Sequence, residues 1–129
     1  MISKKLFEDI LYKYPELIDA GLVPRGRHVN LYDQMVDILF VDRFKKKLVV
    51  QVRTSPIEKE HIGEIVSYQK AVLSGEAPDV SFMLVADKVP PHLKTAFEHK
   101  GVAWKEITVF QIREHLTKRN DTEMLELLS

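Results

Sequence analysis

Residues 35–42 read Met-Val-Asp-Ile-Leu-Phe-Val-Asp, and residues 48–53 read Leu-Val-Val-Gln-Val-Arg. Both apolar runs are typical of buried β-strands, and the short turn at residues 43–45 predicts that they form an antiparallel hairpin. Asp37 interrupts the first run, and Gln51 and Arg53 interrupt the second. A carboxylate in a buried strand costs several kcal/mol unless it is paired or binds a metal. We therefore expect a functional site on this hairpin.

The expected register brings these polar residues together. If Asp42 and Lys46 flank the turn, Asp37 lies opposite Gln51 and diagonal to Arg53 on one face of the sheet. Packing alone would favour valine or isoleucine at such positions. A salt bridge between neighbouring strands is the simpler alternative, because one acid and one arginine need no metal.

The remaining sequence predicts helices and further strands around the hairpin. Ser3 caps a first helix with Phe7, Ile10, Leu11 and Tyr14 on one face, and Pro15 opens a short turn that Gly21 ends. We expect a strand or loop at 22–30, a long helix from Ser55 and Pro56 to about 74, a parallel strand at 80–86, a helix from 91 to 101, an edge strand at 102–107 and a helix at 109–116.

This order of elements predicts an α/β fold, in which an antiparallel hairpin and a parallel crossover strand share one mixed sheet flanked by helices. We expect residues 1–129 to form a single domain, with residues 121–129 as a small amphipathic helix or a loose tail.

Composition narrows the functional classes. Nineteen basic residues balance nineteen acidic ones, so a DNA-binding surface would have to be a local patch. The absence of cysteine suits a reducing cytoplasm, and excludes disulfides and zinc–thiolate sites. No apolar run approaches the roughly 20 residues of a membrane span, so we expect no membrane association.

Several motifs together resemble a known family. Glu8 lies in Leu-Phe-Glu-Asp-Ile-Leu at 6–11, the hairpin carries Asp37, and Gly-Glu-Ile-Val-Ser-Tyr follows at 63–68. The PD-(D/E)XK nucleases carry an acid in a helix, an acid in a strand and a charged motif in the next strand. This sequence resembles that pattern, and in particular it resembles the catalytic domain of NucS-type endonucleases. The similarity covers most of residues 6–107. It implies a restriction-endonuclease-like fold and metal-dependent hydrolysis of DNA, as in DNA repair.

Two departures from this family are visible. The family carries Glu and Lys where this chain has Gln51 and Arg53. This sequence also contains no counterpart of the separate domain with which full-length NucS proteins bind DNA and dimerise.

The resemblance implies a divalent metal, Mg²⁺ or Mn²⁺, held by the carboxylates of Asp37 and Glu8, the amide oxygen of Gln51 and the carbonyl of Val52. Two negative charges replace the family's three, so we expect weak binding. Arg53 can hold a phosphate and stabilise charge, but a guanidinium keeps its proton in proteins and cannot act as a base. Asp37, Gln51, Arg53 and Glu8 are thus the candidate catalytic residues.

Basic residues at two places are candidates for phosphate contacts. Arg25 and Arg27 lie in a segment with glycine and proline, and Lys45 and Lys46 lie at the hairpin tip. Solubility and protection of the sheet edge explain a charged tip equally well. We assign no metal to the histidines, whose spacing is not that of ligands, and expect an exposed helix face for His61 and Glu64 and core positions for Trp104 and Phe110.

Three functions remain open from the sequence. The first is a metal-dependent DNA endonuclease, and the second is an inactive nuclease-fold protein that binds DNA or a protein partner. The third is a structural subunit in which the acid and the arginine form only a salt bridge. A homodimer is expected on general grounds, since small nuclease domains often pair to address two strands.

Overall fold

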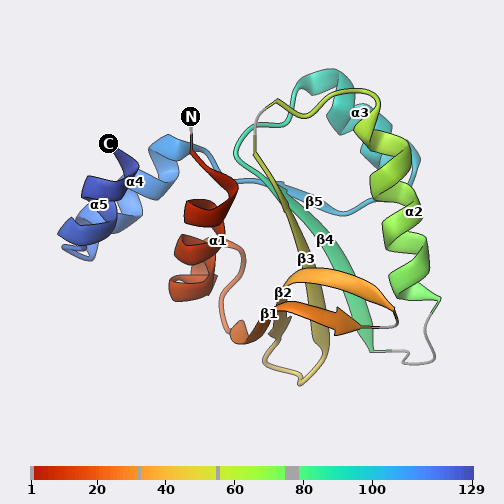
Figure 1. Ribbon diagram of the computed structural model, residues 1–129, viewed down its shortest axis with the longest axis horizontal. Coiled ribbons are helices and arrows are strands. Elements are labelled where there is room, and N and C mark those ends of the chain that lie inside the picture. The colour runs from red at the N-terminus through yellow and green to blue at the C-terminus, as the bar shows by residue number, and fades with distance from the viewer. Residues whose placement is uncertain (1, 32, 55, 75–78) are drawn as a thin grey trace.

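The computed structural model describes residues 2–31, 33–54, 56–74 and 79–129. Its centre is a five-stranded sheet in the order β1-β2-β3-β4-β5 (Figure 1). The first three strands pair antiparallel, and β3, β4 and β5 run parallel. The strands are β1 (Val23–Leu31), β2 (Gln34–Val41), β3 (Lys47–Arg53), β4 (Val80–Ala86) and β5 (Trp104–Glu106).

Helices cover both faces of this sheet (Figure 1). On one side lie α1, α4 and α5, and on the other lie α2 and α3. The helices are α1 (Lys4–Lys13), the short 3-10 helix η1 (Pro15–Leu17), α2 (His61–Leu73), α3 (Pro91–His99), α4 (Val109–Lys118) and α5 (Thr122–Leu128).

Alternation along the strands builds a hydrophobic core on each face. Val50 and Val52 of β3 pack against α1, whereas Val49 packs under α2 and α3. Phe7, Ile10 and Leu11 of α1 are fully buried, as their spacing on one helical face predicts. The mixed α/β fold predicted from the sequence is confirmed.

The hairpin and the crossover follow the predicted register. Ile38 pairs with Val50, and the backbone N–H of Asp42 donates to the carbonyl of Lys46 across the turn. Strand β4 runs parallel to β3. The ambiguous segment at 22–30 is a strand that pairs with β2.

Helix α2 begins later than predicted. The expected start at Pro56 is wrong, because the described helix starts at His61; Ser55 lies outside the described residues. Ile57 is buried in the core below α2 and α3, and the Nδ1 atom of His61 accepts a hydrogen bond from the backbone of Glu58. Burial of Ile57 and this local bond hold residues 56–60 outside the helix.

The C-terminal helix α5 packs against the core of the α1 side through Met124, Leu125 and Leu128. Its N-cap, Asp121, accepts hydrogen bonds from Lys13 and Tyr14 of the first helical region and from the backbone of Met124. The chain end is therefore an ordered helix. Within the described parts of the chain, no helix is both long and apolar enough to span a bilayer.

Candidate metal centre

The site lies where the backbone pairing between β2 and β3 ends. The last paired residues toward the site are Ile38 and Val50. Beyond them, the carboxylate of Asp37 accepts from the backbone N–H of Val52 (2.8 Å), and the amide oxygen of Gln51 accepts from the N–H of Asp37 (3.1 Å). Side chains thus replace the missing backbone bonds, and both polar residues are satisfied although they are buried.

The alternation of β2 side chains between the two faces of the sheet is also interrupted at this point. Ile38 packs in the core on the α1 side, whereas Val36, two residues earlier, packs in the core on the α2 side. In a regular strand these two residues would share a face. The alternation therefore breaks at Asp37, which lets its carboxylate reach α1 at the sheet's opening.

Glu8 enters this opening from α1. Its side chain is 3% exposed, and its Oε1 atom lies 2.8 Å from Nε2 of His28 and 3.4 Å from Nη2 of Arg27. Arg27 also binds Asp9 at 2.7 Å. Burial alone would lower the pKa of Arg27, but its hydrogen bonds to Asp9 and Glu8 outweigh burial and raise that pKa. Arg27 is thus a fixed cation of the site.

Two further cations contact Asp37. Nζ of Lys4 lies 3.2 Å from Oδ1, and Nη1 of Arg53 lies 3.8 Å from Oδ2. Arg53 also donates to the carbonyl of Val52 and lies 3.5 Å from Glu64. Glu64 is exposed, as expected, yet it borders the site through Arg53. Asp37 is therefore held between α1 and the end of β3.

Tyr68 closes the site from the side of α2. Its hydroxyl donates to the carbonyl of Met35. Burial and then the negative charge of Asp37 raise the pKa of Tyr68 to about 12, with Arg53 acting in the opposite sense. The phenol is therefore neutral at physiological pH and serves as a hydrogen-bond donor.

Three side chains fit the requirements of a cation. Glu8, Asp37 and His28 each offer one ligand atom, and these atoms lie within 4.8 Å of one another. Two carboxylates and an imidazole are ordinary ligands of divalent metals in proteins. The residues present therefore fit a metal of the kind that the family resemblance implies.

Sequence reasoning located most of this group. The structure brings Glu8, Asp37, Gln51 and Arg53 to one end of the hairpin. The oxygen of Gln51 is engaged by the backbone of Asp37, and the carbonyl of Val52 by Arg53, so the ligand roles assigned to these two residues stay predictions.

His28 and Lys4, which contact the site carboxylates, were not found from the sequence. No role was expected for His28, because its spacing from the other histidines is not that of metal ligands; in the folded chain it lies instead beside Glu8 and Asp37. Lys4 precedes Glu8 by one helical turn, and that spacing is the signal that would have placed it on the same face.

The predicted phosphate-binding residues separate into two groups. Arg27 belongs to the site, whereas Arg25 is exposed on β1. Lys45 and Lys46 are exposed at the hairpin tip. About five residues of strand separate that tip from Gln51, or roughly 16 Å at the usual rise per residue.

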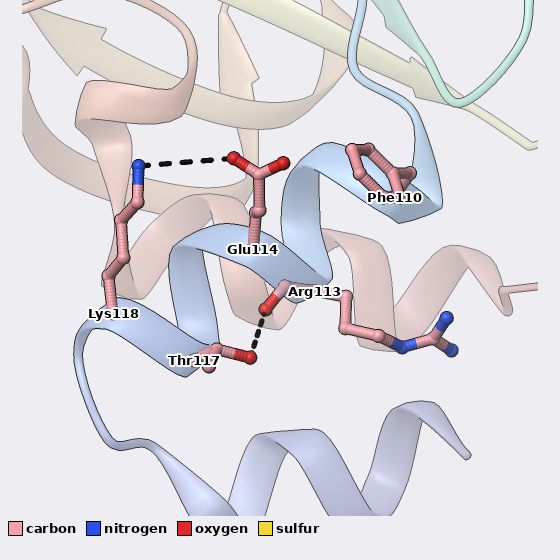
Figure 2. A pocket seen from close by; sticks show the side chains of 5 residues that line it. All are labelled: Phe110, Arg113, Glu114, Thr117 and Lys118. Atoms are coloured by element: carbon pink, nitrogen blue, oxygen red, sulfur yellow. Dashed lines mark hydrogen bonds and ion pairs between the residues drawn. The ribbon is translucent and has the colours of Figure 1, made fainter.

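A hollow of about 340 Å³ lies away from this site, against α4 (Figure 2). Every residue that lines it belongs to α4, and Glu114 and Thr117 are already bonded to Lys118 and to the carbonyl of Arg113. Phe110 is 69% exposed here, so its predicted core position is wrong. Ile112 and Leu116 form the buried face of α4 instead. The hollow brings no polar groups together from different elements, and we do not regard it as the functional site.

The fold of this chain, a mixed sheet flanked by helices, is similar to that of repair endonucleases of known structure. A repair endonuclease from Pyrococcus abyssi superposes with a TM-score of 0.70 at 18% identity, over 84% of this chain and 48% of that chain. EndoMS in a complex with double-stranded DNA gives 0.69 at 20% identity, over 82% and 44%. The predicted likeness to repair endonucleases is confirmed for the fold.

A third structure shows the same fold without the large difference in length. An XisH family protein from Nostoc punctiforme superposes with a TM-score of 0.61 at 14% identity, over 83% of this chain and 94% of that chain. This chain spans about half the length of the two endonucleases. No protein-family model and no curated protein matches the sequence.

Proposed function

We propose that this protein is a metal-dependent DNA endonuclease that hydrolyses phosphodiester bonds at the Glu8–Asp37 site. The observation that carries the proposal is the convergence of two nearly buried carboxylates from separate elements, at the open end of the sheet in a nuclease fold. One neighbour in this fold is bound to double-stranded DNA, which supports DNA as the partner.

The metal would be held by Glu8 and Asp37, and when bound would polarise the phosphate and lower the pKa of water. Around it, the chain supplies cations for the substrate. Lys4 is 44% exposed and Arg53 is 24% exposed at the site, so both can turn from Asp37 to oxygens of a phosphate.

Lys4 takes on a second part of the chemistry. Arg53 stands where the family has lysine, and a guanidinium does not release its proton at physiological pH. An ammonium can exchange a proton when its surroundings change. The ammonium of Lys4 lies 3.2 Å from Asp37. We infer that Lys4 takes the chemical role of the motif lysine, although it comes from a different part of the chain.

A specific observation favours a second candidate, an inactive nuclease-fold protein that binds DNA. Each site carboxylate already has cationic partners, Lys4 and Arg53 for Asp37, and Arg27 for Glu8. Such a network is satisfied without a metal. In that case the basic side chains would bind phosphates and no bond would be cut.

Cleavage assays separate the two candidates. Single-stranded, flap, mismatched and duplex DNA are incubated with the protein and Mg²⁺ or Mn²⁺, and nicked products are measured. Asp37→Asn keeps an oxygen acceptor for the Val52 N–H but removes the charge, so it should abolish cleavage and retain DNA binding. Asp19→Asn, at an exposed acid beyond η1, is the matched control.

If the native protein binds DNA but cuts none of these substrates with either metal, the inactive candidate holds.

We also propose that residues 1–129 act as one domain, supported by the single sheet with a core on each face. Homodimerisation and a cytoplasmic location remain predictions from the sequence.

A further inference from the structure

Resting on the proposed metal-dependent function, we propose that His28 is a third protein ligand of the metal, and that it makes the site selective for Mn²⁺ or a similar transition ion over Mg²⁺. Sequence reasoning assigned no role to His28. In the folded chain its Nε2 atom lies 2.8 Å from Oε1 of Glu8, and both belong to the cluster with Asp37.

The distances suit one cation after the three side chains move closer together. Ligand atoms at about 2.1 Å from an octahedral ion lie about 3 Å apart when adjacent and about 4.2 Å apart when opposite. The ligand atoms of Glu8, His28 and Asp37 lie within 4.8 Å of one another. The longest separation therefore has to shorten by at most about 0.6 Å for opposite ligands, or by at most about 1.8 Å for adjacent ones, which is within the reach of side-chain movement.

The backbone of β1 is arranged to aim His28 at this point. His28 has a φ of 51° inside a strand, a left-handed conformation that is uncommon for residues other than glycine. Arg27 and His28 are neighbours, and successive side chains of a regular strand point to opposite faces. Here both reach the same oxygen of Glu8. The left-handed backbone of His28 in β1 and the break in side-chain alternation at Asp37 in β2 thus form one irregularity across the two neighbouring strands.

The chemistry of the donors sets the choice of metal. Mg²⁺ prefers oxygen ligands, whereas an imidazole nitrogen favours first-row transition ions. Gln51 stands where the related nucleases have a carboxylate, and its oxygen is engaged by the backbone N–H of Asp37. The imidazole of His28 supplies the third strong donor that the amide does not.

An alternative is that His28 only pairs with Glu8 and never touches a metal. Pulsed electron paramagnetic resonance of bound Mn²⁺ decides between the two, since a coordinated imidazole produces a ¹⁴N coupling and an oxygen ligand does not. The experiment uses the full chain, with Mn²⁺ and Mg²⁺ affinities measured by calorimetry on the same samples.

The test variant is His28→Asn, because asparagine tolerates the left-handed backbone and keeps the fold. The native protein should show the ¹⁴N coupling and the variant should lose it. We expect Mn²⁺ affinity to fall about tenfold or more, with Mg²⁺ affinity changing less than about threefold. His92→Ala, at an exposed histidine on α3, should leave both affinities and the coupling unchanged.

Each outcome bears on a different claim. Bound Mn²⁺ without a ¹⁴N coupling, or with a coupling that persists in His28→Asn, overturns the role of His28. The proposed nuclease then still stands, provided that Asp37→Asn abolishes Mn²⁺ binding. A native protein that binds neither ion overturns both the ligand and the metal-dependent function.

Discussion

At the scale of single residues, Asp37 and Gln51 each act in two ways. They satisfy backbone groups where β2 and β3 separate, and they stand in the site. An acid inside an apolar strand indicates this position in the sequence, because burying it without partners is costly. The contribution of His28 has no such signal, since its left-handed backbone and the approach of Glu8 arise only in the folded chain.

Introducing the residues that PD-(D/E)XK nucleases carry at these two positions should strengthen the site. The double change Gln51→Glu with Arg53→Lys adds a carboxylate beside Asp37 and a smaller cation. We expect Mn²⁺ affinity to rise about tenfold or more, because a third negative charge would lie within a few ångströms of the ion. The metal-free protein should melt at a lower temperature, since two acids would then repel each other, and added Mn²⁺ should reverse this loss. Calorimetry and thermal melts measure both effects. The single change Gln51→Glu shows how much of each effect comes from the added negative charge and how much from replacing arginine by lysine.

Replacing Lys4 should change metal affinity and DNA cleavage in opposite directions. Lys4→Met removes a cation that competes with the metal for Asp37, so Mn²⁺ should bind several-fold more tightly. Cleavage should nevertheless fall about a hundredfold, the usual scale for loss of a positioned proton donor or acceptor. Lys5→Met, at the exposed neighbour on α1, is the control. Weaker metal binding in Lys4→Met would contradict the competition for Asp37, and unchanged cleavage would show that Lys4 has no part in the reaction.

At the scale of elements, the periodicity of apolar residues predicted the helices and strands well, and the errors lie at ends. Helix α2 begins at His61, because the burial of Ile57 is a tertiary effect that a proline signal cannot reveal. Val109 packs on the core, and Phe110 is the next residue around the helix. The ring of Phe110 therefore points to solvent. Thr108 caps α4 in a capping box with Gln111, as sequence rules anticipate.

The attachment of α5 depends on the charge of Asp121. Hydrogen bonds from Lys13 and then Tyr14 lower the pKa of Asp121 to about 2. A carboxyl whose pKa is lower in the folded state stabilises it above the unfolded pKa of about 3.9, and loses this effect as pH falls toward the folded value. Asp121→Asn should therefore lower the melting temperature by several degrees at pH 7, and the difference from the native protein should shrink between about pH 4 and pH 2.

Thermal melts of both proteins across this pH range measure the effect, with Asp19→Asn as the control. A difference that stays constant down to pH 2 would show that the charge of Asp121 does not hold the helix.

At the scale of the whole molecule, the hairpin tip and the site lie at opposite ends of β3. A DNA duplex that reached both would cross the length of that strand. Lys45→Asn with Lys46→Gln removes two charges, and asparagine tolerates the φ of 64° at position 45. If the tip binds phosphates, the slope of log affinity against log salt should become shallower by up to about 1.8, or about 0.9 for each phosphate that is no longer neutralised.

Fluorescence anisotropy at several salt concentrations gives this slope. Lys118→Gln on α4, also strongly exposed, should leave it unchanged. An unchanged slope in the double variant would leave the tip with the role of keeping the sheet edge soluble.

Whether Glu8 and Asp37 form a metal centre can be decided with crystals soaked in Mn²⁺ and measured for anomalous scattering. We expect a peak between the two carboxylates, about 2.0–2.3 Å from an oxygen of each, with Lys4 displaced from Asp37. If no peak lies at this position, and Lys4 and Arg53 are still bound to Asp37, the metal centre is refuted and the residues form a salt-bridge network in a nuclease fold.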